Sequence, residues 1–247
     1  MNPRCYVPEA EAWPETVELD RATSHHLVRV LRVTPGAPVT LFNGRGASAE
    51  AEVSAAGRAG VTVRVRRRRT TPPVAPHVTL VQALIRPQPM DSVFRKATEI
   101  GASAIQPVIT ARCVARTRER PDRWQKTLVA AAEQCGIDWL PVIEPVCTWS
   151  EFLATTGQDD HLLLCSLDPA ARPLKDVLRA GPAAGRWAAL VGPEGDFTPG
   201  EAAEAMAAGA VPVSLGCQTL RAETAALYVL ACLRYEFAAP FGAATGR

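Results

Sequence analysis

The sequence WAALVGPEGDFTPGE, at residues 187–201, indicates the fold class of this chain. Its first five residues are a continuous apolar run, which is typical of a strand buried on both faces. Residues 192–197 contain two glycines and a proline, a composition that builds a tight loop. Residues 198–201, TPGE, form a capping box that predicts a helix from there to residue 208. A buried strand, a tight loop and a capped helix in succession are the unit of an α/β domain.

The same alternation extends through the rest of the chain after residue 76. Strands are expected at residues 78–84, 104–109, 161–167 and 211–215, and helices at residues 91–100, 121–134 and 222–237. The helix at 121–134 has a proline in its first turn, and Gly136 lies just past its end. This region is therefore predicted to be one α/β domain.

The N-terminal region has a different pattern. It contains strand candidates at residues 39–42, 49–53 and 61–65, an Asn43-Gly44 turn signal and one helix candidate at residues 24–31. Three prolines between residues 72 and 76 predict a stiff linker. We predict a small β-barrel-like domain at residues 1–72 and an α/β domain at residues 73–247.

The charge is uneven between the two regions. Residues 1–72 hold 11 Lys and Arg against 7 Asp and Glu, whereas residues 73–247 hold 16 against 18. A basic small domain suits a protein that binds a polyanion, but an arginine-rich solvated surface explains the excess equally well. The N-terminus has no signal-peptide pattern and no apolar run is long enough for a membrane span, so a cytoplasmic location is expected.

The seven cysteines are scattered, with no CxxC pair, and the four histidines supply no metal-ligand spacing either. Reduced thiols and no metal site are therefore expected. Dinucleotide-binding, P-loop, zinc-protease and serine-hydrolase motifs do not occur.

Three loops that follow predicted strands contain the candidate functional residues of the second region. They are residues 166–169 (SLDP), 192–197 (GPEGDF) and 215–225 (LGCQTLRAETA). Ligands of open α/β sheets bind outside the carboxyl ends of the strands, so these loops could line one pocket. Each loop alone could also be an ordinary turn between a strand and a helix.

In combination and order, these loops resemble the RsmE-type SPOUT methyltransferases, which make N3-methyluridine in small-subunit ribosomal RNA. GPEGDF is similar to that family's GPEGG(F/L) loop, and SLGCQTLRAETA at 214–225 is similar to its SLGxxxLRxETA loop. Weaker matches are RKATEIG at 95–101, EQCG at 133–136, HHLVRVLR at 25–32 and LFNG at 41–44. The resemblance spans residues 4–237.

The sequence departs from the family pattern at three places. Asp196 stands where the family has a second glycine, residues 217–219 (CQT) replace Pro-Arg-Ile, and Ile137 replaces an arginine. The lost arginines put the identity of the substrate in more doubt than the fold.

The resemblance implies a deep trefoil knot formed by residues 162–224, S-adenosylmethionine bent within it, a PUA-like RNA-binding barrel at the N-terminus, and a homodimer. The apolar spacing of Leu227, Leu230, Leu233 and Phe237 on the last helix suits either a dimer contact or simple core. The partner implied is ribosomal RNA, with no membrane.

The resemblance also implies roles for individual residues in catalysis, cofactor binding and RNA binding. Arg221 is the candidate for stabilising a uracil anion, and Glu194 or Glu223 is the candidate proton acceptor; a structural salt bridge is the alternative role for Arg221. The cofactor would be held by Leu164, Val191, Gly192, Pro193, Gly195, Leu215, Gly216, Leu220, Ala222, Thr224 and Ala225. Phosphates would be bound by Arg4, Arg29, Arg32, Arg66, Arg67, Arg68 and Arg69, and by the basic segment 112–123.

Two other functions fit parts of the pattern. The loops alone also suit a ribose 2′-O-methyltransferase of the same class. The departures at 196 and 217–219 also suit a non-catalytic RNA-binding protein of ribosome assembly whose pocket has decayed.

Overall fold

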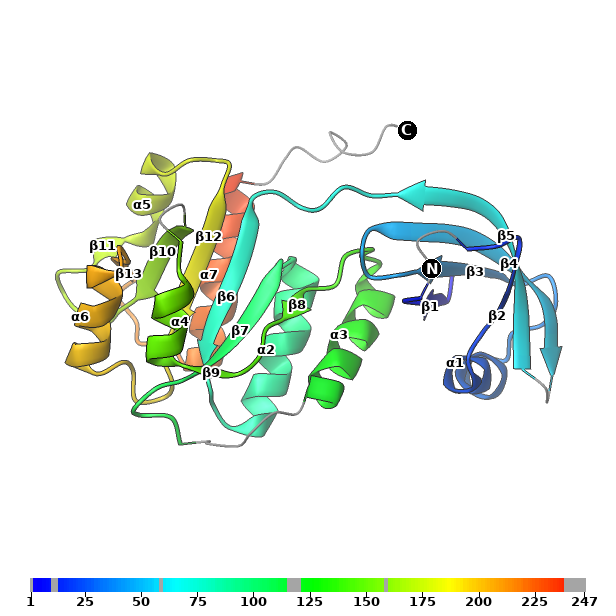
Figure 1. Cartoon of the computed structure of the whole chain (residues 1–247), viewed down its shortest axis with the longest axis horizontal. Coiled ribbons are helices and arrows are strands. Elements are labelled where there is room, and N and C mark those ends of the chain that lie inside the picture. Colours follow the sequence, from blue (N-terminus) through cyan, green and yellow to red (C-terminus); the bar gives the residue numbers. More distant parts are fainter. Residues whose placement is uncertain (1, 10–12, 58–59, 115–120, 158–159, 238–247) are drawn as a thin grey trace. The chain divides into compact units, whose positions relative to one another are not determined.

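The computed structural model describes residues 2–9, 13–57, 60–114, 121–157 and 160–237. The chain divides into two compact units, each with its own sheet (Figure 1). Of these described residues, the first unit comprises those up to 73 together with 129–140, and the second comprises those from 74 to 128 and from 141 to 237. Helix α3 (Pro121–Cys135) therefore contributes residues to both units.

The first unit is built on a five-stranded sheet in the order β1-β3-β4-β5-β2. Its strands are β1 (Arg4–Tyr6), β2 (Thr16–Glu18), β3 (Pro38–Phe42), β4 (Ala47–Gly57) and β5 (Gly60–Thr70). β1 pairs with β3 in parallel, and the other pairs are antiparallel. β4 and β5 are longer than the predicted strands because their pairing continues past the apolar residues into polar and arginine-rich sequence.

Besides the end of α3, the described residues of the first unit form one helical segment, which begins earlier than predicted. Asp20 caps α1 (Arg21–His25) by accepting hydrogen bonds from the backbone of Ala22 and Thr23. A π-helical turn, η1 (His26–Val30), follows directly. Leu27 of this turn is fully buried in the core, which also contains Leu41 and Val63 from the sheet.

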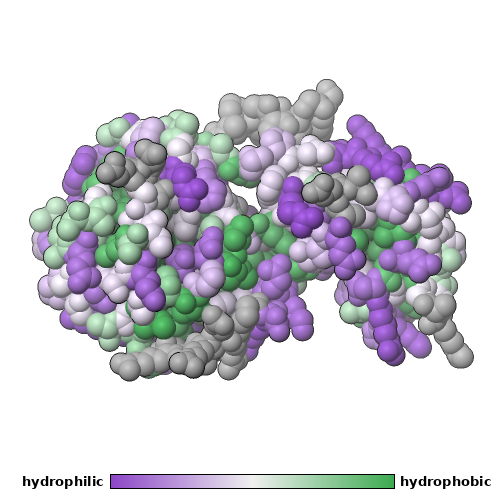
Figure 2. Space-filling view, viewed as in Figure 1, coloured by the Kyte–Doolittle hydropathy of each residue, from purple (hydrophilic) through white to green (hydrophobic). Residues whose placement is uncertain are grey.

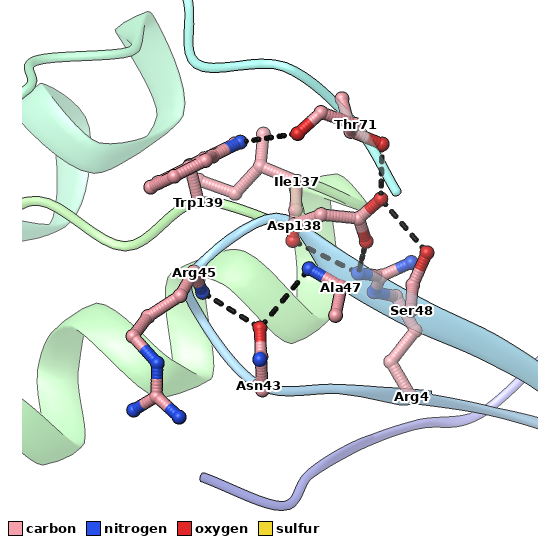
Figure 3. A network of polar contacts seen from close by, with 9 residues as sticks. All are labelled: Arg4, Asn43, Arg45, Ala47, Ser48, Thr71, Ile137, Asp138 and Trp139. Carbon is pink, nitrogen blue, oxygen red and sulfur yellow. Dashed lines mark hydrogen bonds and ion pairs between the residues drawn. The ribbon is translucent and has the colours of Figure 1, made fainter. Parts of the chain in front are cut away.

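Residues 129–140 join the first unit through a polar network (Figure 3). The Asp138 carboxylate accepts hydrogen bonds from Arg4 (2.7 Å), the Ser48 hydroxyl (3.0 Å) and the Thr71 hydroxyl (2.9 Å). The Trp139 indole donates to the carbonyl of Thr71 at 2.8 Å. Sequence analysis assigned these residues to the second domain, but their side chains are bound to the sheet of the first unit.

The second unit contains a parallel sheet in the order β11-β13-β10-β12-β6-β7-β8, with β9 also paired to β7. Its strands are β6 (His77–Ala83), β7 (Ala104–Ile109), β8 (Val142–Ile143), β9 (Cys147–Thr148), β10 (Asp160–Cys165), β11 (Arg172–Pro173), β12 (Arg186–Val191) and β13 (Val211–Ser214). The predicted α/β domain is confirmed, and its longer strands match the prediction within two residues.

Helices cover both faces of this sheet (Figure 1). They are α2 (Pro87–Ile100), α4 (Trp149–Thr155), α5 (Leu174–Ala180), α6 (Pro199–Ala207) and α7 (Ala222–Phe237). α7 packs against α2 and α5, and α4 contacts α6. The capping box predicted at Thr198 and Glu201 is present at the start of α6. The prediction missed α4 and α5 and began α2 four residues late, because Pro87 occupies the first turn of that helix.

Candidate active site

A cavity of about 750 Å³ lies at the carboxyl ends of four adjacent strands of the second unit, β13, β10, β12 and β6. The loops that follow these strands form its walls. Its volume falls within the roughly 300–1,000 Å³ that small-molecule sites occupy, and its place is the one where open parallel sheets bind ligands. The three loops singled out in the sequence all contribute to it.

The loop after β12 is folded tightly. A side chain at Gly192 would place its Cβ 3.0 Å from Asp196 Oδ1 and 3.1 Å from the backbone nitrogen of Phe197, so only glycine fits without a shift. Asp196 has φ of 60°, the left-handed region that a glycine would occupy at no cost. Its carboxylate accepts a hydrogen bond from the Phe197 backbone at 2.8 Å, and aspartate tolerates this conformation better than most residues. Asp196 therefore preserves the loop shape although it departs from the family pattern.

The loop after β13 leads into α7. Gly216 has φ of 128°, and its backbone NH and carbonyl both lie 3.3 Å from the Ser214 hydroxyl. Arg221 ends the loop, and its carbonyl accepts a hydrogen bond from the backbone of Ala225 in the first turn of α7. The Arg221 side chain is exposed at the cavity, and the structure records no ion pair between it and any described residue. The salt-bridge role considered for Arg221 thus has no partner in the described part of the chain.

The loop after β10 is held by its own side chains. The Ser166 hydroxyl accepts a hydrogen bond from the backbone of Asp168, and the Asp168 carboxylate accepts one from the backbone of Ala170 at 2.8 Å. Just before this loop, burial and then the nearby charge of Asp196 raise the pKa of the Cys165 thiol to about 12. Cys165 is therefore a neutral thiol in the wall of the cavity and no nucleophile at neutral pH.

The cavity wall carries more acidic than basic groups among the described residues. Its carboxylates are Asp168, Glu194, Asp196 and Glu223. Its two cations are Arg86, after β6, and Arg221. The carboxylates of this wall can bind a positively charged small molecule. The two arginines can bind a negatively charged group.

Most of the residues predicted to hold a cofactor line this cavity. They are Val191, Gly192, Pro193, Leu215, Gly216, Leu220, Ala222 and Ala225, together with the predicted catalytic residues Arg221 and Glu194. Leu164 is buried inside β10, Gly195 packs against Arg112, and Thr224 is exposed on α7; none of these three lines the cavity. Sequence reasoning missed Arg86 and Pro89, because no glycine or capping motif marks the loop after β6.

Arg112, which follows β7, binds the backbone of the loop after β12. Its guanidinium donates to the carbonyl oxygens of Gly195 (2.7 Å) and Phe197 (3.3 Å). The neighbouring backbone NH of Ala111 donates to the Glu201 carboxylate at 2.7 Å, which ties the same segment to the start of α6. Arg112 belongs to the segment predicted to bind phosphates, but one of its guanidinium nitrogens, Nη1, is bound within the protein. Residues 115–120 of that segment lie outside the described residues.

We expect Arg112→Ala to weaken binding of the cofactor that the resemblance implies, S-adenosylmethionine, about tenfold, because the loop after β12 loses two charge-assisted hydrogen bonds that fix its shape. Calorimetry in excess chelator measures this affinity. Arg112→Lys should restore only part of it, since one ammonium cannot match a planar guanidinium bound to two carbonyls. Arg95→Ala, an exposed change on α2 away from the cavity, is the control. If Arg112→Ala binds the cofactor with unchanged affinity, the hydrogen bonds of Arg112 to this loop do not contribute to cofactor binding.

The arginines predicted to bind RNA in the first unit fall into three groups. Arg4 is nearly buried: it pairs with Asp138, donates to the carbonyl of Ile137 and lies 4.7 Å from the centre of the Phe42 ring, so its charge is neutralised and shielded from a phosphate (Figure 3). Its assignment to RNA is therefore corrected to a structural role. The carbonyl of Ile137 serves this network whatever its side chain, so the departure at that position leaves the contact intact.

The four consecutive arginines of β5, residues 66–69, are exposed, and three of them form an ion pair or a hydrogen bond within the protein. Arg66 pairs with Glu52 at 2.9 Å, Arg69 lies 3.8 Å from Glu50, and Arg68 donates to a backbone carbonyl at 2.7 Å. By contrast, Arg29 and Arg32 are exposed, and the structure records no ion pair for either with a described residue. Much of the visible face of the first unit is hydrophilic in Figure 2.

The part of the chain that the structure describes contains no group of three or more His, Cys, Asp or Glu placed to hold a metal ion. It also contains no helix that is both long and apolar enough to cross a bilayer.

Comparison with known proteins gives matches over nearly the whole chain. Residues 72–234 match the family model of an RNA methyltransferase domain, and residues 19–66 match that of an RNA methyltransferase PUA domain. The chain is 34% identical over 220 residues to ribosomal RNA small subunit methyltransferase E of Mycobacterium tuberculosis, covering 86% of this chain and 83% of that protein. It is 34% identical over 235 residues to the protein of the same name from Synechocystis, covering 94% and 77%.

Two solved structures are similar over 95% of this chain and 98% of theirs. One is ribosomal RNA small subunit methyltransferase E from Neisseria gonorrhoeae bound to S-adenosyl methionine, with a TM-score of 0.87 and 33% identity. The other is a methyltransferase from Legionella pneumophila in complex with the same cofactor, with a TM-score of 0.85 and 28% identity.

Proposed function

Because this chain belongs to the RNA methyltransferase family that includes the ribosomal RNA small subunit methyltransferases E, we propose that it transfers a methyl group from S-adenosylmethionine to N3 of a uridine in small-subunit ribosomal RNA. The observation that carries the proposal is the cavity in which the GPEGDF and LGCQTLRAETA loops meet at the carboxyl ends of β12 and β13. The uridine N3 position rests on the family resemblance and on the chemistry of Arg221. The knot, which the same resemblance implies, is part of this proposal.

The cavity suits S-adenosylmethionine by size and charge. Its glycine-containing loops bring backbone groups to the surface, where they can bind the adenine and the ribose. The carboxylates of Asp168, Glu194, Asp196 and Glu223 suit the ammonium and sulfonium charges of the molecule. When bound, S-adenosylmethionine supplies a methyl group that leaves its sulfur as the new bond to nitrogen forms.

The residues of the chain must then prepare the nucleophile. The N3–H of uracil is weakly acidic, so its proton has to leave before or during the attack. We assign Arg221 to the uracil oxygens, where its positive charge stabilises the anion that develops. Glu194 or Glu223 accepts the proton; both line the cavity. The loops contribute by holding the nitrogen and the methyl carbon in attack geometry.

The experiment that tests this function is nucleoside mass analysis of ribosomal RNA from a strain that lacks the gene. Loss of one N3-methyluridine from the small subunit, restored by the gene, is the expected result. Alkali resistance separates the alternative: a ribose 2′-O-methyl product protects the RNA from alkaline cleavage at that nucleotide, whereas N3-methyluridine leaves the 2′-OH free. No change in any modified nucleoside would favour the non-catalytic RNA-binding function.

We also expect a dimer in solution. Leu230 and Leu233 are fully buried, so they belong to the core of the second unit. A different face of α7 is exposed, with Tyr228, Ala231 and Tyr235, and Tyr235 has 87% of its surface accessible. Sedimentation at micromolar concentration should give a dimer, and a Tyr228→Asp, Tyr235→Asp variant should shift it toward monomer because charge is costly in an apolar contact. A monomeric wild-type protein contradicts the expectation.

A further inference from the structure

The turn from His26 to Arg32 in the first unit has an unusual backbone. The backbone NH of Leu31 donates to the carbonyl of His26 at 3.1 Å, a π-helical bond, and Arg32 then has φ of 55°. Left-handed backbone is uncommon for a residue other than glycine, and both π-helical turns and such strain are found preferentially at functional sites. The side chains that this turn presents to solvent are therefore candidates for a function.

Buried side chains and hydrogen bonds hold the turn to the sheet of the first unit. Leu27 is 1% exposed and packs in the core of the sheet, and the backbone NH of Val33 donates to the Leu27 carbonyl at 3.0 Å. In the preceding helix, the Ser24 hydroxyl donates to the carbonyl of Leu19 and accepts from the backbone of Val61. The exposed side chains of the turn are thus held in place by buried neighbours.

Two apolar side chains are exposed where a regular helix would bury them. Leu27, Val30 and Leu31 have the i, i+3, i+4 spacing that an α-helix places on one face. The wider turn and the left-handed Arg32 end the helix there, and Val30 and Leu31 remain 61% and 46% exposed. They are flanked by Arg29 and Arg32, for which the structure records no ion pair with a described residue.

The charges on β5 are arranged differently. Arg66 and Arg69 lie beside Glu52 and Glu50 of the neighbouring strand, which cancel part of their charge. A phosphate that approached β5 would have to compete with these carboxylates. Arg64 and Arg67 of β5, like Arg29 and Arg32 of the turn, have no recorded ion pair with a described residue. The η1 turn differs from β5 because its arginines flank exposed apolar side chains, which β5 lacks.

We propose that residues 29–32 form a contact for unpaired RNA nucleotides, in which Arg29 and Arg32 bind phosphates and Val30 and Leu31 pack against an exposed base. This inference rests on the proposed action on ribosomal RNA and adds to it the conformation of the RNA that the first unit recognises. Unpaired RNA fits both the arginines and the apolar side chains of this surface. Bases in a duplex are stacked on one another and cannot pack against apolar side chains. Phosphates supply the negative charge that complements the two arginines.

The test compares the full-length protein with two double variants, using fluorescence anisotropy with an unstructured single-stranded RNA and a duplex RNA of the same length over a salt series. Arg29→Ala, Arg32→Ala should weaken binding of the single strand and flatten its salt dependence by roughly 0.7 for each lost phosphate contact. Val30→Ser, Leu31→Ser should weaken binding of the single strand about tenfold with the same salt slope, because the lost contact is apolar. Binding of the duplex should change less than twofold in the serine variant.

Matched controls keep the interpretation sharp. Arg64→Ala removes an exposed arginine of β5 and should have a smaller effect than either arginine of the turn. Arg32→Gly removes the charge while relieving the left-handed strain, so a loss of affinity in this variant at an unchanged melting temperature comes from the lost charge. Affinity for S-adenosylmethionine should be unchanged in every variant.

Several outcomes overturn the proposal. Equal binding of single-stranded RNA by the serine variant and the wild type refutes the base contact. Equal losses for single strand and duplex refute the preference for unpaired nucleotides, and a changed sedimentation coefficient with unchanged RNA affinity assigns the surface to a protein contact. A wild-type protein that binds RNA through this turn but methylates none would instead refute the proposed function.

Discussion

Arg221→Ala is expected to lower the single-turnover rate of methyl transfer by about 10²–10³-fold, the range for losing one electrostatic stabiliser of a transition state. The side chain lies at the cavity and is exposed, and no described residue forms an ion pair with it. A guanidinium in this state has donors free for the two carbonyl oxygens that flank N3 of uracil. Because few protein contacts depend on it, stability should change little.

Two comparisons isolate the chemical role of Arg221. Arg221→Lys should recover only part of the rate, because a point charge cannot match two planar contacts. Raising the pH should partly rescue Arg221→Ala, since more uridine is then already ionised without help from the protein. The rates are measured with enzyme in excess over RNA and with both substrates saturating, so that binding does not limit them.

The control for this experiment is Arg95→Ala, which removes an exposed arginine of the same unit that does not line the cavity. Its rate should equal that of the wild type. A normal rate in Arg221→Ala would exclude the residue from the mechanism and direct attention to Glu194, which lines the same cavity. Loss of the folded state, seen as a lowered melting temperature, would instead give Arg221 a structural role.

Local sequence signals predicted much of the second unit. The apolar run at 187–191 and the capping box at Thr198 appear as β12 and the start of α6, and α7 begins and ends at the predicted residues. These signals act within a few residues, so a sequence alone contains them. The prediction that the three loops line one cavity rests on a general rule: neighbouring parallel strands have their carboxyl ends at the same edge of the sheet.

What the sequence could not predict depends on long-range pairing. Arg86 lines the cavity only because β6 pairs with β12, more than 100 residues further along the chain, and periodicity contains no information about strand order. The assignment of Arg4 to RNA fails because charge counts cannot reveal that a single, nearly buried carboxylate, Asp138, neutralises it. The same applies to residues 129–135, which complete α3 with no break in composition and yet, with residues 136–140, belong to the first unit.

Asp138→Ala should destabilise the first unit by about 3–5 kcal/mol, because it leaves the nearly buried guanidinium of Arg4 without its counter-charge. The two side chains are only 10% and 12% exposed, and their atoms lie 2.7 Å apart (Figure 3). The hydroxyls of Ser48 and Thr71 lose their acceptor at the same time. Hydrogen exchange measured by mass spectrometry should show faster exchange in β4 and in residues 129–140.

Local exchange is the appropriate measurement because a chain with two units need not unfold in one step, so a global free energy of unfolding is ill-defined. Glu99→Ala provides the control for charge removal: its pair with Lys96 is more exposed than that of Arg4 with Asp138, at 48% and 25%, and breaking it should cost less than about 1 kcal/mol. An Arg4→Met, Asp138→Ala double variant should be less destabilised than Asp138→Ala alone, since no unpaired buried charge remains. If the double variant were instead as unstable as the sum of the two single changes, the hydroxyl contacts of Asp138, and not its pairing with Arg4, would hold residues 129–140 to the sheet.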